Sequence, residues 1–574
     1  MAEPTHGEQD RDEGEAREPA SAMPAAEAGT STGVAALRDL RRRRQLHRLG
    51  NLDWFEAAYR VYLFGFFGGG AVLWLSSSVK DEPVSAALQA DILRHGPSVL
   101  GLLVAVAFMA GVRGGAQGGP LALEAADVTY IMLAPIDRLH ALMRPAAQRL
   151  RSALFSGALA GGIVGQLAGR RLPGGTFQWF CSGALYGMNL AAVWVGAALF
   201  AHVVRMPRWM ATLFGLIGVG WQAAAIAWGV PGAFNLDGSL ALWGWRVHPV
   251  DLLAVAVSAA VVVFGITQLR RISLDALARR SALVAQLRFA VTMQDLRTVI
   301  LLRRQLNQEH SRRRPYIRMR PAGPGTGLTA SIWRRGWHGL LRFPVPRLVR
   351  MAALAATMGV LQAMVIRGTT PAFLATAIIG FVLGMEASEP LSQEVDQADR
   401  ADALPIERGE LMSRHLLAPA VMLIPFGLIA GLVAYFTLGA NSDALVPALI
   451  LCVPNVLGGA TGGVISIVRD MPDPSSATTQ QAFMPPEMVG FTSALRIAWP
   501  ILVSAAGVST VLLVRVAMRL GDSLTGAAIR GALGSLLIVV LVHQWVRLRD
   551  RLRRRIREFM EEGRNYTAQQ RSSA

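Results

Sequence analysis

Long apolar blocks alternate with charged segments along the chain, and this pattern predicts membrane-spanning helices. Each block is long enough to cross a hydrocarbon core of about 30 Å as a helix. The twelve predicted spans lie at 59–79, 97–113, 152–169, 178–204, 209–229, 248–268, 349–367, 371–387, 417–438, 443–468, 489–515 and 523–546. We therefore predict an all-α polytopic membrane protein with about 12 transmembrane helices.

A polar stretch occurs twice, at a constant offset of 270 residues, between the second and third predicted spans of each half. Seven positions are identical and one exchanges Asp for Glu. The pairs are Pro120 and Pro390, Leu121 and Leu391, Glu124 and Glu394, Pro135 and Pro405, Ile136 and Ile406, Asp137 and Glu407, Arg138 and Arg408, and Arg144 and Arg414. An ungapped match of this kind indicates an internal repeat. Because each half has six spans, both halves have the same orientation, and we predict two parallel six-helix repeats.

A second pair of polar positions supports the repeat. Asn189 lies in the fourth predicted span and Asn455 in the tenth, and each is followed by Arg and a Met-Pro pair where the helix is predicted to leave the membrane. A buried Asn in a span either lines a pathway or forms an interhelical hydrogen bond. Both residues are therefore candidates for lining a pathway.

Charge fixes the orientation. The chain has 574 residues, 52% of them hydrophobic, a net charge of +18 and a mean hydropathy of +0.37. With the amino terminus inside, 47 of the 57 Lys and Arg residues fall on the cytoplasmic side and eight in outer loops. This bias predicts a multi-pass protein of the cell membrane with both termini cytoplasmic. Since the loops account for the basic residues, we predict contact with membrane lipids and no nucleic-acid partner.

The composition outside the spans divides the chain further. Residues 1–36 are acidic and predict a disordered cytoplasmic tail. The first six-span half, 37–270, opens with an Arg-rich segment that suits a helix in the headgroup plane or a solvated basic tail. Residues 271–345 form a cytoplasmic helical and interfacial linker, or a plain linker. The second half is 346–546, and 547–574 is a basic cytoplasmic tail, disordered from Glu561.

The chemistry that is absent limits the functions. Lys80 is the only lysine and lies outside any Gly-rich turn, so the chain has no P-loop. Sequence motifs for zinc ligation and for a serine nucleophile are also missing. Cys181 and Cys452 fall inside apolar spans and suit packing. We predict no enzyme activity and no catalytic, cofactor or metal site in this chain.

The repeated stretch carries the candidate site. Its Pro-Ile-acid-Arg run offers Pro to start a short helix, Ile for docking, and an acid and Arg for ionic pairing. We predict loop helices at 133–144 and 403–414 that couple to a soluble partner. The partner-coupling residues are Pro135, Ile136, Asp137, Arg138, Pro405, Ile406, Glu407 and Arg408. A helix that only returns the chain to the membrane would have the same composition.

These features resemble the permease subunits of type-2 ATP-binding-cassette exporters, in their fused, duplicated form. In that family a coupling helix of the pattern Leu-Pro-Ile/Val-Ser/Glu-Arg lies between the second and third spans. Residues 404–408 read Leu-Pro-Ile-Glu-Arg, and residues 134–138 read Ala-Pro-Ile-Asp-Arg. The resemblance covers roughly residues 37 to 546. It implies that ATP and Mg²⁺ bind to a separate cytoplasmic ATPase subunit, two copies of which clasp the two loop helices.

Two other functions fit the same pattern. A gradient-driven secondary transporter also has two parallel halves joined by a long central loop. No acidic residue lies at a predicted span centre, which disfavours proton coupling. A non-transporting membrane scaffold that recruits a cytoplasmic enzyme through its basic surfaces is the third hypothesis.

Overall fold

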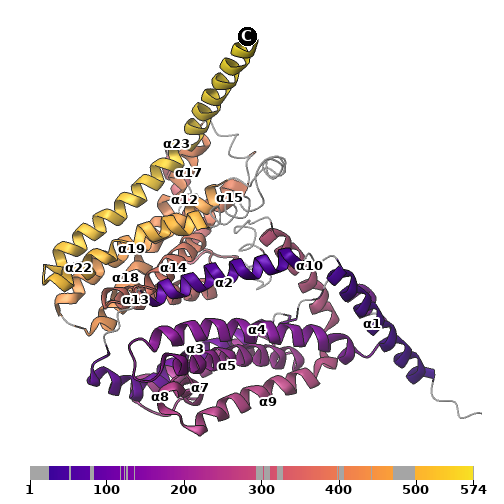
Figure 1. Cartoon of the computed structure of the whole chain (residues 1–574). Helices are drawn as coiled ribbons and strands as arrows, with labels where there is room; N and C mark the ends of the chain where they lie inside the picture. The colour runs from indigo at the N-terminus through magenta and orange to yellow at the C-terminus, as the bar shows by residue number, and fades with distance from the viewer. Residues whose placement is uncertain are drawn as a thin grey trace, which may run out of the picture.

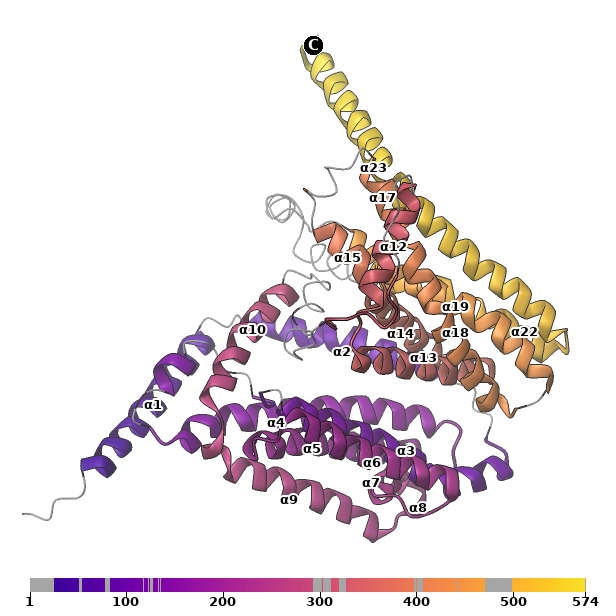
Figure 2. The same ribbon diagram turned by 180° about the vertical axis from the view of Figure 1, so that it is seen from behind.

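The computed structural model describes residues 25–50, 54–77, 83–116, 118–121, 123, 127–132, 134, 136–292, 302, 311–319, 327–396, 399, 406–440, 442–469 and 498–572. Regular structure in these ranges is helical, without a strand. Figure 1 and the reverse view in Figure 2 show two groups of helices, α3 to α10 and α12 to α23, with α2 between them.

The first group and the helices before it have these bounds: α1 Ala25–Gly50, α2 Trp54–Ser77, α3 Ala86–Ala116, the π-helix η1 Asp127–Ile131, α4 Arg138–Ala168, α5 Thr176–Val203, α6 Arg208–Trp228, α7 Asn235–Leu240, α8 Trp243–Arg246, η2 Pro249–Leu252, α9 Leu253–Thr267, η3 Leu269–Arg271 and α10 Leu274–Thr292. The second group has α12 Leu328–Leu340, α13 Val345–Ile366, α14 Ala372–Ala387, α15 Glu389–Asp396, α17 Arg408–His415, α18 Leu417–Leu438, α19 Ser442–Val468, α22 Val511–Leu520 and α23 Leu524–Ser572.

Within the described residues, nine helices are long and apolar enough to cross a membrane. They are Ala86–Ala116, Thr176–Val203, Arg208–Trp228, Pro249–Thr267, Val345–Ile366, Arg408–Leu438, Asp443–Val468, Ala498–Leu520 and Leu524–Leu552. The bent pair Ala372–Ala387 and Glu389–Val395 makes a tenth if it is one span. The predicted spans 59–79 and 152–169 fall in α2 and α4, which are helical but not among the nine. The chain thus has the all-helical, multi-span pattern of a membrane protein.

Small residues let α4 and α5 approach closely. A Cβ atom built on Gly161 of α4 would lie within 3 Å of the Gly183 carbonyl oxygen of α5. One built on Gly187 would meet the Gly157 carbonyl oxygen in the same way. Glycines four residues apart on two facing helices are typical of helix packing in membranes, where van der Waals contact replaces the hydrophobic effect.

The connection between α6 and α9 folds back onto the first group. Gly238 of α7 lies so close to α3 that an added Cβ would collide with the Pro97 carbonyl oxygen. Gln222 of α6 ties the connection down, because its Nε2 donates to Asn235 Oδ1 at 2.7 Å and its Oε1 accepts from the Phe234 N–H at 3.0 Å. The segment therefore brings polar groups of α7 against the spans.

The two groups share a packing order. In the first, α5 contacts α3, α4 and α9, and in the second, α19 contacts α14, α18 and α23. The interior of each group is apolar, with Val195 and Leu199 of α5 and Cys452 and Val456 of α19 almost fully buried. The fourth predicted span of each half therefore lies at the centre of its group.

The ends of the chain differ from the prediction of disorder. Helix α1 begins at Ala25, inside the tail predicted to be disordered to residue 36, and residues 1–24 lie outside the described ranges. Helix α23 continues to Ser572, past the predicted break at Glu561. Ala is the commonest residue in 25–36, and Glu, Gln, Arg and Ala make up more than half of 561–572, so both stretches contain residues of high helix propensity.

The linker contains two helices. Helices α10 and α12 both lie within the predicted linker, residues 271–345. The rings of Trp333 and Trp337 in α12 lie edge to face, with their centres 5.7 Å apart, and both pack against the core of the second group. These aromatic side chains therefore attach the linker to the second group.

Candidate functional site

The acidic residue of the Pro-Ile-acid-Arg run, Asp137 or Glu407, is the N-cap of a helix in both copies of the repeated stretch. Asp137 precedes α4, and its Oδ1 accepts from the Leu139 N–H at 3.3 Å. Glu407 precedes α17 with an extended backbone and makes no side-chain cap hydrogen bond. A carboxylate at this position faces the positive end of the helix dipole, so the repeat conserves favourable electrostatics at both helix starts.

Each acidic side chain also pairs with Arg that follows the sixth predicted span of its half. Arg270 of η3, directly after α9, donates to Asp137 Oδ2 at 2.8 Å. Arg551 and Arg554 of α23 donate to Glu407 at 2.9 and 3.0 Å. The repeated stretch is therefore held, in both halves, against the segment that follows the sixth predicted span. We call these two contacts the acid–arginine clasps.

The clasps change the acidity of both carboxyl groups. Burial alone raises the pKa of Asp137, but the hydrogen bonds from the Leu139 N–H and Arg270 outweigh it and hold that pKa below its usual range. The hydrogen bond from Arg551, with that from Arg554, lowers the pKa of Glu407. Both groups are ionised at neutral pH.

The other residues of the two runs take matched positions. Ile136 and Ile406 are half-buried, and Ile406 packs against the Ile332 and Leu411 pair. The side chains of Arg138 and Arg408 are exposed. Pro135 and Pro405 lie outside the described residues. Each described run therefore presents a basic residue outward beside a docked Ile.

The helices that carry these runs differ from the predicted lengths. The helix predicted at 133–144 begins at Arg138 and continues as α4 to Ala168. The helix predicted at 403–414 begins at Arg408, and α17 is followed directly by α18, so Arg408–Leu438 forms one candidate span. The apolar residues that follow each run extend the helix, so each run begins a long helix.

One further helix packs near each clasp, α1 in the first half and α12 in the second. Arg41 of α1 donates to the Ala141 carbonyl oxygen of α4 at 2.7 Å, and Leu37 is buried in the same apolar cluster as Leu142. In the second group, Arg335 of α12 lies 2.7 Å from Glu394. The corner around each clasp is thus built from three parts of the chain.

Asn189 and Asn455 are buried and form matched interhelical hydrogen bonds. Ser258 of α9 donates to Asn189 Oδ1 at 2.7 Å, and Ser535 of α23 donates to Asn455 Oδ1 at 2.7 Å. Asn455 Oδ1 also accepts from Thr510 at 2.8 Å. These bonds join the fourth and sixth predicted spans of each half, and a pathway-lining role stays a prediction.

Sequence reasoning missed a carboxylate beside Asn189. Asn189 Nδ2 donates at 2.7 Å to Asp237 of α7, which comes from the connection between α6 and α9. Burial raises the pKa of Asp237, and its hydrogen bond from Asn189 counters that rise. The apolar residues Leu236, Leu240 and Leu242 around Asp237 were a signal that this segment does not simply face water.

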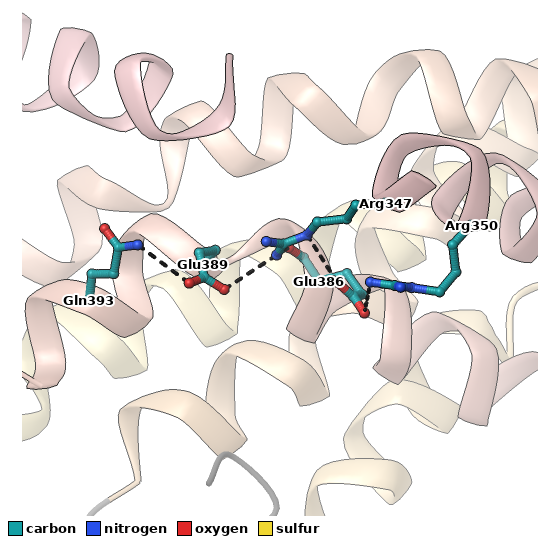
Figure 3. A network of polar contacts seen from close by, with 5 residues as sticks. All are labelled: Arg347, Arg350, Glu386, Glu389 and Gln393. Carbon is teal, nitrogen blue, oxygen red and sulfur yellow. Dashed lines mark hydrogen bonds and ion pairs between the residues drawn. The ribbon is translucent and has the colours of Figure 1, made fainter. Parts of the chain in front are cut away.

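A buried ionic network lies where α13 meets α14 and α15 (Figure 3). Arg347 Nε lies 3.0 Å from Glu386 Oε2, and its Nη2 lies 3.3 Å from Glu389 Oε2. Arg350 reaches Glu386 Oε1 at 2.9 Å, and Gln393 donates to Glu389 at 3.3 Å. Since Arg347 and Glu386 are almost fully buried, the network fixes the bend between α14 and α15.

Among the described residues, no cluster of three or more His, Cys, Asp or Glu side chains is placed to share a metal ion. No curated protein and no solved structure matches the chain. Residues 94–477 match DUF6297, a family of unknown function, and this range includes both repeated stretches and both buried Asn residues. The match spans more than half of the sequence, so the chain belongs to the DUF6297 family.

Proposed function

We propose that this protein is the membrane-spanning permease subunit of an ATP-binding-cassette exporter, driven by separate cytoplasmic ATPase subunits. The observation that carries the proposal is the pair of acid–arginine clasps. Asp137 with Arg270, and Glu407 with Arg551, place the two copies of the repeat in the same local structure. Two equivalent corners are what a dimeric partner with two equivalent surfaces requires.

The helices that begin at these corners are suited to transmit force. Helix α4 runs without a break through 31 residues, a length of about 46 Å at 1.5 Å per residue. A partner that presses on Arg138 would move α4 and, through Asp137 and Arg270, also the end of α9. The same reasoning applies to α17 and α23. Each clasp would thus couple one cytoplasmic contact to two helices of the same half.

The proposal includes twelve spans in two parallel halves. The nine candidate spans, the bent pair α14 and α15, and helices α2 and α4 together account for twelve. The shared packing order around α5 and α19 supports a common architecture for the halves. With both termini cytoplasmic, ATP-driven approach of the two corners would rock the halves and open a path outward.

One observation favours a second candidate, a gradient-driven carrier. Asp237 reaches the buried Asn189 and supplies a titratable carboxyl group against the fourth predicted span. Proton-coupled carriers use such groups within the membrane. This candidate predicts transport by the purified chain alone when a proton gradient is imposed.

The test is purification of the tagged chain in mild detergent, followed by mass spectrometry of co-purifying proteins and an ATPase assay. A stoichiometric soluble subunit with a P-loop and vanadate-sensitive turnover is the expected result. A chain that purifies alone, without ATPase activity, but carries out gradient-dependent transport in liposomes would replace the exporter by the carrier. Partner binding without any transport would support the third hypothesis, a non-transporting membrane scaffold.

A further inference from the structure

A cavity of about 220 Å³ lies within the second group of helices. Helices α13, α18, α19 and α22 and the first residue of α23 surround it. Its wall is mostly apolar, with Gln362 and Cys452 as the polar groups at its inner part and Asp443 also in the lining. The residues that define its inner wall are Gln362, Ile366, Leu451, Cys452 and Val514.

The side chain of Gln362 is only partly satisfied. It is 1% exposed, and its Oε1 accepts from the Cys452 thiol at 2.9 Å. Its Nε2 is buried and has no hydrogen-bond partner among the described residues, and Gln362 is one of the residues that line the cavity. A buried N–H group without an acceptor costs roughly 1–3 kcal/mol. An acceptor placed in the cavity would remove that cost.

The first group shows how such amides are satisfied by the chain itself. Gln222 Nε2 donates to the Ser98 carbonyl oxygen at 2.8 Å and to Asn235. Asn189 Nδ2 donates to Asp237. Both Asn235 and Asp237 belong to α7, in the connection between α6 and α9.

Among the described residues, the second group has no counterpart of α7. Its connection between α22 and α23 consists of residues 521–523. Asn455 Nδ2, the counterpart of the Asn189 group, is buried without a partner among the described residues. Asn455 follows Cys452 by three residues and so lies on the same face of α19. Within the described part of the second group, Gln362 and Asn455 thus each have an amide donor without an acceptor of the kind that α7 supplies in the first group.

We propose that the cavity binds a neutral amphiphile, a hydrocarbon chain that carries an uncharged carbonyl oxygen such as that of an acyl ester. The chain would lie against Ile366, Leu451 and Val514, and the carbonyl oxygen would accept from Gln362 Nε2. A carboxylate is disfavoured because none of the described residues that line the cavity is basic and one of them, Asp443, is acidic. The proposal concerns a ligand site and does not depend on an ATPase partner.

The test uses the full chain in lipid nanodiscs with two photoreactive probes, the methyl ester of a diazirine-bearing dodecanoic acid and the same diazirine on dodecane. Peptide mapping locates the labelled residues. The ester is expected to label 434–452 saturably and the hydrocarbon to label it weakly. In Gln362→Leu the advantage of the ester over the hydrocarbon should fall by about five- to tenfold.

Further variants separate binding from folding. Ala444→Trp blocks the lining at a half-exposed position and should abolish the labelling, whereas Leu428→Trp on the exposed face of α18 should leave it unchanged. A phosphatidylcholine with the diazirine on one acyl chain distinguishes a membrane lipid from a free ester. Labelling by either molecule supports the site. Labelling that does not saturate, or that Ala444→Trp leaves unchanged, overturns the proposal.

Discussion

Arg270 Nη2 lies 2.8 Å from Asp137 Oδ2, although 133 residues separate the two in sequence. The second half repeats this contact between Glu407 and Arg551, at 2.9 Å. The acid lies at a helix start and the arginine lies beyond the sixth predicted span of its half. Each pair therefore joins the helix that contains the third predicted span to the segment that follows the sixth. The repeated stretch is thus a structural joint as well as a surface.

The first prediction concerns the outward side of that joint. Arg138 and Arg408 are exposed beside the two clasps. If the proposed ATPase partner binds there, Arg138→Glu combined with Arg408→Glu should abolish its binding, because the double change reverses the charge at both proposed contact surfaces. Pull-down of the partner and the ATPase rate of the eluate measure the effect.

The control for that variant is Arg43→Glu, an exposed change on α1 in an ion pair with Asp39. It should leave both partner binding and membrane insertion unchanged. Full partner binding by the Arg138 and Arg408 double variant would remove the coupling assignment from the repeated stretch.

The second prediction concerns pH. The folded-state pKa of Asp137 lies below its unfolded value, so its ionised form stabilises the fold. That contribution is fully present above the unfolded pKa of about 3.9 and is lost as pH falls through the lower, folded value. The melting temperature of Asp137→Asn should therefore be lower than that of the wild type at pH 7, and the difference should shrink below about pH 4.

A series of melting curves between pH 7 and pH 3 checks this sign. Arg270→Gln removes the partner and should show the same convergence with the wild type at low pH. If the difference in melting temperature between the wild type and Asp137→Asn grew as the pH fell, the assignment of the clasp would be contradicted.

The apolar pattern predicted helix positions closely because the membrane demands long apolar segments. The predicted spans 178–204 and 443–468 correspond to helices Thr176–Val203 and Ser442–Val468. The two ends of the chain differ from the prediction of disorder, since α1 begins at Ala25 and α23 continues to Ser572. Composition was weighed there for hydrophobicity and charge and not for helix propensity. Local sequence thus predicts where the chain can cross a membrane better than where its polar helices end.

The sequence predicted only the acidic residue of each acid–arginine clasp. The internal repeat identified Asp137 and Glu407 but not Arg270 or Arg551, because a contact across more than a hundred residues leaves no local signature. Asp237 was missed because its loop folds back onto α5. An arginine shortly after the sixth predicted span of each half was the available signal.

The third prediction concerns the contact between α4 and α5. Gly161→Ala should destabilise the protein strongly, because its Cβ would collide with the Gly183 carbonyl oxygen and force the helices apart. Gly220→Ala in α6 is the matched control, since nothing lies within 4 Å of its Cβ. That change should be neutral or stabilise by up to about 1 kcal/mol, because Ala has the higher helix propensity.

Thermal unfolding of both glycine variants in the same detergent distinguishes the two effects. Equal melting temperatures for Gly161→Ala and Gly220→Ala would show that α4 and α5 are not in close contact. That result would also remove the support that this contact gives to α4 as a membrane span.

The fourth prediction compares the two buried Asn residues. Asn189→Leu leaves the Asp237 carboxyl group without its amide donor, and should cost about 1–3 kcal/mol. Asn455→Leu should cost less, because Asn455 donates to no carboxyl group among the described residues. The serines do not differ in this respect, since Ser258 keeps its bond to the Val255 carbonyl oxygen at 3.0 Å and Ser535 keeps its bond to the Gly507 carbonyl oxygen at 2.9 Å. Unfolding midpoints for the two variants measure the difference, and a larger loss at Asn455 would contradict it.

The last prediction concerns the buried network of Figure 3. Arg347 donates to the Glu386 backbone carbonyl, pairs with the Glu386 and Glu389 carboxylates, and its guanidinium lies 3.7 Å from the centre of the Phe343 ring. Arg347→Met would remove one ion-pair partner from each of Glu386 and Glu389, while Arg350 would still reach Glu386. Breaking a buried pair in this way costs about 3–5 kcal/mol, far more than the loss of an exposed pair.

Chemical unfolding of Arg347→Met beside Arg43→Met checks the magnitude, since the second variant breaks the exposed pair with Asp39 and should lose no more than about 1 kcal/mol. Glu389, a partner of Arg347, begins α15, which carries the start of the second copy of the repeated stretch. Arg347→Met should therefore also raise the amide hydrogen exchange of α15. Unchanged exchange in α15 with reduced global stability would mean that Arg347 supports α13 and α14 alone. Equal losses in the two variants would mean that the network is too well hydrated to fix the bend.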